Sequence, residues 1–160
     1  MTSTAPVAAV VVVDGRVLRL HVMELGLACC GLEMRQARRS GLLDRLAGSP
    51  GLAPVAEPAG LPATGVPGGP GGVALEVLVV AGTVTTLLAD AVREAHAALP
   101  EPRAVLAFGA CAATGGPYWD SYAVVPGAHE IVPVDVWVPG CPPRPADLVE
   151  GLREVLRAAA

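Results

Sequence analysis

Short apolar stretches alternate with longer stretches of mixed polarity along this chain. Each apolar stretch is rich in β-branched residues and is bounded by Gly, Pro or Asp, the pattern expected of β-strands. The stretches that predict strands are residues 7–13, 16–22, 73–81, 103–108 and 131–138. The first two are joined by Asp14 and Gly15, a pair typical of a tight turn, so the sequence predicts an N-terminal β-hairpin.

Apolar residues also recur at three- and four-residue steps, as they do on the buried face of a helix. This spacing predicts helices over residues 32–46, between Thr83 and Pro100, and from Pro145 toward the C-terminus. Thr83 is placed to cap the second helix, and proline suits the first turn of the third. The alternation of strands and helices predicts an α/β fold, with a parallel sheet, right-handed crossovers and helices on both faces.

The length of 160 residues fits a single domain over residues 1–160, which can bury roughly 70% of its unfolded surface. Its composition is 52% hydrophobic but only 3% aromatic, so the core must consist mainly of Val, Leu and Ala. Residues 48–72 are dominated by Pro, Gly and Ala and show no periodicity. We interpret them as a flexible insertion, because ordered connections of this length are uncommon.

The net charge of −4 argues against a nucleic-acid-binding surface, which is usually basic. No apolar run approaches the roughly 18 residues that cross a bilayer. The first residues include no early basic side chain, so they do not resemble a secretory signal. These observations favour a protein of the reducing cytoplasm, where disulfides are rare.

The four cysteines all lie beside Gly or Pro, and each site follows a predicted strand. Cys29 and Cys30 are adjacent in GLACCG, Cys111 lies in GACA, and Cys141 lies in PGCPP. Because the carboxyl ends of parallel strands share one edge of a sheet, three distant loops should deliver four thiols to that edge.

Thiolates are soft ligands that suit zinc and iron-sulfur clusters. The chain has no CxxC pair, and its sites are far apart in the sequence, which makes a zinc ribbon a poor match. A vicinal pair plus two remote thiols can instead surround a [4Fe-4S] cube, which takes one sulfur at each iron. The alternatives are inert thiols, disulfides, a vicinal disulfide acting as a redox switch, and a structural zinc site.

Three groups of motifs give the chain a specific resemblance. They are GLACCGLEM, then VLVVAGTVTTLLADAVREAHAALPEPR, and finally GACAATGGPYWDSYAVV with IVPVDVWVPGCPP. Together they resemble the B subunit of bacterial NADH-quinone oxidoreductase, respiratory complex I, over about residues 19–47 and 73–158. The N-terminal hairpin and the Pro/Gly-rich stretch depart from that family's pattern.

The resemblance implies a flavodoxin-like α/β subunit that holds one [4Fe-4S] cluster and passes electrons toward quinone, without being catalytic alone. It maps the four cluster ligands onto Cys29, Cys30, Cys111 and Cys141. It implies a large catalytic subunit and a ferredoxin-like subunit as partners, quinone at the interface, and a peripheral position on the cytoplasmic face of the membrane. The small subunits of membrane-bound [NiFe] hydrogenases share some of these motifs, so a hydrogenase-like complex is the alternative function. A clusterless or zinc-binding scaffold subunit is the second alternative.

Other side chains have candidate roles near the cysteines. Glu33 follows the vicinal pair and is a candidate proton relay, although an acid in the first turn of a helix also complements the helix dipole. The arginines of residues 35–45 form a solvated or partner-facing side, and the three histidines are interpreted as structural. The aromatic residues of the loop after GACA either cover the cluster or pack their own loop against the sheet; they are Tyr118, Trp119 and Tyr122.

Overall fold

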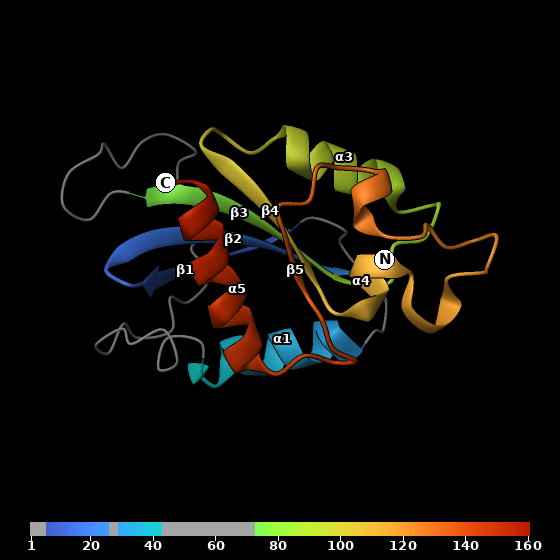
Figure 1. Ribbon diagram of the computed structural model, residues 1–160, viewed down its shortest axis with the longest axis horizontal. Helices are drawn as coiled ribbons and strands as arrows, with labels where there is room; N and C mark the ends of the chain where they lie inside the picture. The colour runs from blue at the N-terminus through green and yellow to red at the C-terminus, as the bar shows by residue number, and fades with distance from the viewer. Residues whose placement is uncertain (1–5, 26–28, 43–72) are drawn as a thin grey trace.

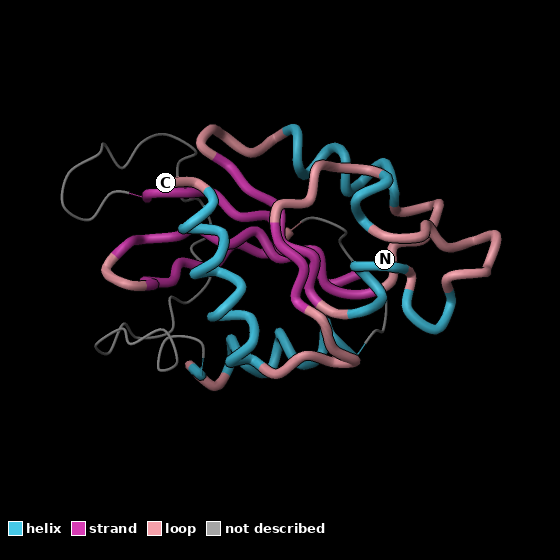
Figure 2. The backbone as a smooth tube through the Cα atoms, viewed as in Figure 1, coloured by secondary structure: helices cyan, strands magenta, loops and turns pink. Residues whose placement is uncertain are grey.

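The computed structural model describes residues 6–25, 29–42 and 73–160, which form a five-stranded mixed sheet with helices on both faces (Figure 1). The strand order is β1-β2-β3-β4-β5, and the parallel strands therefore follow one another in chain order. Figure 2 shows the strands in magenta, with helical segments in cyan around them. The strands are β1 Val7–Val13, β2 Arg16–Leu25, β3 Val73–Gly82, β4 Arg103–Phe108 and β5 Val136–Val138. The predicted α/β fold with a parallel sheet is confirmed, and β1 adds one antiparallel strand at its edge.

The predicted hairpin is confirmed between β1 and β2, which pair in register from Val7 with Val22 to Val13 with Arg16. Asp14 and Gly15 form the two-residue turn, with φ of +49° and +77°. Positive φ at both central residues matches the twist of the flanking strands, which is why Asp-Gly suits this position.

Within the described part of the chain, helices lie on both faces of the sheet. The helices are α1 Cys29–Arg39, α3 Ala89–Ala97, the short α4 Ala110–Thr114 and α5 Pro145–Ala158. Helices α1 and α5 pack on one face and α3 packs on the opposite face (Figure 1). None of the helices in the described ranges has the length and hydropathy that crossing a bilayer requires.

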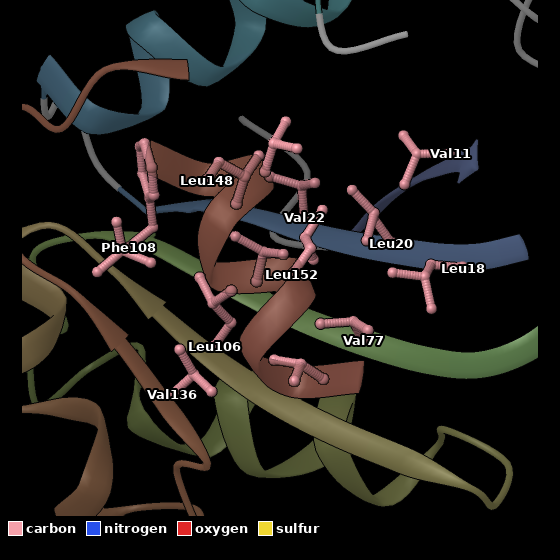
Figure 3. Packing of buried hydrophobic residues seen from close by; sticks show 14 of the residues in the cluster. Val11, Leu18, Leu20, Val22, Val77, Leu106, Phe108, Val136, Leu148 and Leu152 are labelled. Atoms are coloured by element: carbon pink, nitrogen blue, oxygen red, sulfur yellow. The ribbon is translucent and has the colours of Figure 1, made fainter. Parts of the chain in front are cut away.

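The larger core lies between α5 and the sheet. Leu148 and Leu152 of α5 contact apolar side chains of the central strands, among them Leu106 and Val77 (Figure 3). A Cβ on Gly151 would lie 2.5 Å from Val138 Cγ2, so α5 approaches β5 at the distance that glycine permits. The predicted helix from Pro145 is confirmed as Pro145–Ala158, and its buried face includes Leu148, Val149, Leu152 and Leu156.

Two predicted helix starts are wrong. Helix α1 begins at Cys29, earlier than predicted, so the adjacent cysteines open the helix instead of preceding it. Helix α3 begins at Ala89 without a side-chain cap, because Thr83 and the residues after it run alongside a later loop through the Thr85–Val124 bridge. Part of the predicted helix over residues 32–46 and the whole predicted insertion over residues 48–72 lie outside the described residues.

The strand predicted over residues 131–138 is confirmed only as Val136–Val138. A 3-10 helix, η2 Ala128–Glu130, ends next to Ile131, and Pro133 lacks the N–H that a strand ladder needs. Asp135 makes two hydrogen bonds to Val105 of β4. Its backbone N–H donates to Val105 O at 2.9 Å, and its side-chain Oδ2 accepts from Val105 N at 2.8 Å. Pro133 therefore keeps the first part of residues 131–138 out of the sheet, and only the last part forms β5.

Candidate functional site

The adjacent thiols occupy the first turn of α1, directly after β2. Cys30 is 1% exposed and shares the buried face of α1 with Met34 and Ala37, at helical spacing. Cys29 is exposed. Because consecutive residues on a helix point in directions about 100° apart, one thiol faces the core while its neighbour faces the surface.

The third thiol, Cys111, lies in α4, which begins as soon as β4 ends, and it is 5% exposed. Gly109 precedes it with φ +91°, and a Cβ at that position would collide with Cys30 Sγ. Gly116 follows it with φ +56°, and a Cβ there would lie 2.9 Å from Cys111 Sγ. Both glycines therefore leave room around the buried thiols, and Gly109 brings the end of β4 against α1.

The fourth thiol, Cys141, follows β5 and is exposed. The loop that carries Cys141 is hydrogen-bonded to the start of α4, the helix that carries Cys111. Gly109 N donates to Val138 O at 2.8 Å, and Ala110 N donates to Gly140 O at 2.8 Å. These two hydrogen bonds join the carboxyl ends of β4 and β5 and hold Cys141 near the other thiols.

The neighbouring thiols contribute to the raised pKa values of Cys30 and Cys141. Burial raises the pKa of Cys30 to about 12, with further upward contributions from the charges of Cys29, Cys111 and Cys141. The charge of Cys29, followed by burial and the charge of Cys111, raises the pKa of Cys141. All three cysteine sites thus follow parallel strands at one edge of the sheet, as predicted. The role of the four cysteines as ligands stays a prediction.

All four cysteines are free, so none of the disulfide alternatives is formed. In the described ranges, no group of three or more Cys, His, Asp or Glu side chains has the arrangement that would hold a single metal ion. Four sulfurs bound to one zinc at 2.3 Å would lie about 3.8 Å apart, whereas a four-iron cube takes one thiolate at each corner.

A cleft of about 460 Å³ opens beside the exposed thiol of α1. Its lining residues are Cys29, Leu32, Glu33, Arg35, Gln36, Arg39 and Pro142. Glu33 thus lies in the same cleft as Cys29, and its role as a proton relay stays a prediction. Leu32 is 55% exposed at the surface of this helix.

The three aromatic side chains of the loop after α4 are exposed to solvent. Tyr118, Trp119 and Tyr122 are 56%, 66% and 99% exposed, so both predicted packing roles are wrong for Tyr122. The histidines have structural settings: His21 Nε2 lies 2.6 Å from Glu76 Oε2, and His129 pairs with its neighbour Glu130.

Sequence reasoning missed Glu24, which lies under α1. It binds Arg35 and Arg38, which the sequence placed on a solvated or partner-facing side. The only signal was a single acid near the end of β2, followed 11 and 14 residues later by basic residues. No local pattern connects positions at that separation.

Comparison with known proteins gives a consistent family. Residues 28–155 match the family model of the NADH ubiquinone oxidoreductase 20 kDa subunit. The chain is 43% identical over 141 residues to the B 2 subunit of NADH-quinone oxidoreductase from Streptomyces griseus, and the match covers 86% of this chain and 52% of the relative.

Two further relatives carry corresponding names. The chain is 43% identical to the B 2 subunit of NADH-quinone oxidoreductase from Symbiobacterium thermophilum, over 81% of this chain and 63% of the relative. It is 44% identical to the B subunit of the enzyme from Amoebophilus asiaticus, over 83% of this chain and 73% of the relative. The chain thus spans between about half and three quarters of the length of these relatives.

Among solved structures, the chain is similar to a chain of the membrane-bound sulfane sulfur reductase, an archaeal respiratory membrane complex. The TM-score is 0.61 with 24% sequence identity, over 90% of this chain and 70% of the other. At this identity the similarity supports the fold alone.

Proposed function

The chain belongs to the family of the NADH ubiquinone oxidoreductase 20 kDa subunit, also named the B subunit of NADH-quinone oxidoreductase, and from this we propose that it is an electron-transfer subunit. In this proposal it holds one [4Fe-4S] cluster through Cys29, Cys30, Cys111 and Cys141. It passes electrons toward quinone within a multi-subunit respiratory complex at the membrane. The observation that carries the proposal is that three separate segments, each following a parallel strand, bring four free thiols to one edge of the sheet.

The residues present fit such a cluster. Four thiolates are the donor set that a [4Fe-4S] cube needs, and the chain provides one for each iron. Gly109 and Gly116 keep the space next to Cys30 and Cys111 clear of side chains. Cys29 and Cys30 lie in the first turn of α1, where the helix dipole would stabilise a negatively charged cluster.

The distribution of exposure divides the site into two sides. Cys30 and Cys111 are buried, so their side of the site is shielded from water. Cys29 and Cys141 are exposed, so the opposite side lies at the surface. When bound, the cluster supplies one-electron redox chemistry, while the chain positions it, buries one side and leaves the other accessible to a partner.

The cleft beside Cys29 gives this proposal a place for the acceptor. In the proposed complex a large catalytic subunit covers this face, quinone binds at the interface, and a ferredoxin-like subunit supplies electrons. Glu33 lines the cleft, where a carboxyl group can exchange protons with a quinone that is being reduced. The subunit then sits peripherally on the cytoplasmic face of the membrane and catalyses no reaction alone.

Anaerobic reconstitution with iron and sulfide tests the cluster. We expect about four iron and four acid-labile sulfide per chain, and a low-temperature electron paramagnetic resonance signal after reduction. C141A and C30A should each lower the iron content or alter the signal, and S121A, at a half-buried residue of the loop after α4, serves as a control. Binding of zinc alone would support the scaffold alternative. A reduced signal unchanged in C141A would contradict the four-ligand assignment.

A further inference from the structure

A nearly buried carboxylate joins the end of β2 to α1. The Glu24 side chain is 10% exposed, and its Oε2 accepts hydrogen bonds from Arg35 Nε at 2.9 Å and Arg35 Nη2 at 2.7 Å. Its Oε1 accepts from Arg38 Nη2 at 3.2 Å. Arg35 and Arg38 lie three residues apart on α1, so they are neighbours on the same side of the helix. One carboxylate therefore contacts the helix at two points.

The helix lies directly against Glu24 at its first turn as well. Gly31 is buried, and a Cβ added there would lie 3.5 Å from Glu24 Cβ. Cys30 immediately precedes Gly31. Any rotation or outward shift of α1 relative to Glu24 therefore displaces the Cys30 thiol from its place beside Gly109.

The contact with Arg38 is costly to break. The Arg38 side chain is 20% exposed, and within the described part of the chain its Nε is buried without a hydrogen-bond partner. Glu24 is the carboxylate that compensates this guanidinium. Removing it would leave a largely buried cation unpaired, which drives the helix end toward water.

We propose that Glu24 is a positioning residue for the thiol site: by binding Arg35 and Arg38, it fixes the distance and rotation of α1, and with them Cys29 and Cys30. Where it concerns a bound cluster, this inference rests on the proposed function. The placement of the thiols in the cluster-free protein is tested independently. The same contact has an electrostatic consequence, because two guanidinium groups and one carboxylate leave a net positive charge near the site.

The first experiment measures alkylation of individual thiols in the reduced, cluster-free protein, resolved by tandem mass spectrometry. In E24A, Cys30 should react about tenfold faster than in the wild type, because a charge-assisted contact that keeps it buried is lost. Cys111 is also buried but belongs to α4, so its rate is an internal control for general loosening. A rise at Cys30 alone supports the proposal; no rise, or equal rises at both thiols, would overturn it.

Two more variants complete this experiment. R93A removes an exposed ion pair with Asp90, whose atoms lie 2.6 Å apart, and should leave the Cys30 rate unchanged. R35A removes two of the three hydrogen bonds to Glu24 and keeps the experiment decisive if E24A does not fold, since Arg35 is 49% exposed. The effects of E24A and R35A should be less than additive, because both remove the same contact.

The second experiment measures the midpoint potential of the reconstituted cluster. E24Q removes a negative charge and should raise the potential, whereas R35A removes a positive charge and should lower it. Shifts of opposite sign distinguish this role from a purely structural one, since general loosening would move both variants alike. Shifts of the same sign would overturn the electrostatic part. If the wild type takes up no iron and sulfide, the proposed function fails, and the alkylation rates still decide the positioning role.

Discussion

Replacing Gly109 by alanine perturbs the point where β4 meets the Cys30 thiol. Gly109 has φ +91° and ψ 165°, a backbone region nearly restricted to glycine, where another residue costs about 1–3 kcal/mol. Its new Cβ would also collide with Cys30 Sγ and lie 3.3 Å from Pro143 Cδ. Overpacking of this kind costs about 1–3 kcal/mol. We therefore expect G109A to lower the free energy of unfolding by roughly 2–6 kcal/mol.

Urea unfolding followed by circular dichroism measures this loss, and G15A is the matched control. Gly15 also has a positive φ, +77°, but nothing lies within 4 Å of a Cβ placed there. G15A should therefore cost only the backbone term, about 1–2 kcal/mol. The double variant G109A/C30A removes the colliding sulfur, so its total cost should fall short of the sum of the single variants by about 1 kcal/mol or more.

Two results would refute this reasoning. Equal losses in G109A and G15A would mean that no steric contact exists at Gly109. Additivity within about 0.5 kcal/mol in G109A/C30A would mean that Cys30 Sγ is not the group that the Cβ meets.

Three further predictions concern the rest of the fold. G151A should lower the free energy of unfolding in urea by about 1–2 kcal/mol, because its Cβ would meet Val138 Cγ2 at 2.5 Å. The higher helix propensity of alanine offsets part of this loss, and an unchanged free energy of unfolding would contradict the close packing. Burial, followed by the charge of Arg103, lowers the pKa of His96 from 6.5, so the folded protein binds this proton less readily than the unfolded chain. Stability should therefore fall as the pH drops from about 6.5 toward the lower folded pKa, and H96Q should remove that part of the dependence in unfolding measured at pH 5 and pH 8. E76A should lower the free energy of unfolding by about 3 kcal/mol, because it leaves unpaired two basic side chains of β2 that share this buried carboxylate; a loss below 1 kcal/mol would show the pairing to be dispensable.

The strands were predictable where the local pattern and the tertiary packing agree. Residues 73–81 and 103–108 are apolar runs bounded by Gly or Pro, and the structure has strands at Val73–Gly82 and Arg103–Phe108. Asp14 and Gly15 predicted their turn for the same reason, since the required φ values are a local property.

Predictions failed where a distant contact competes with the local preference. Thr83 is a good cap by type, but the segment after it pairs with a loop near Val124, and the helix starts only at Ala89. The apolar run ahead of Val136 alternates like a strand, yet its proline and the preceding 3-10 helix leave only three residues to pair. The contact of Glu24 with α1 had no local signature at all.

For the thiols, the order of residues along the chain was enough to place each of the three sites after a strand, and parallel pairing then directs all of them to one edge of the sheet. The burial of Cys30 and Cys111 and the exposure of Cys29 and Cys141 became known from the folded arrangement instead. Burial depends on which elements pack over a residue, and here those elements come from positions up to about a hundred residues away in the chain, beyond the reach of any local pattern.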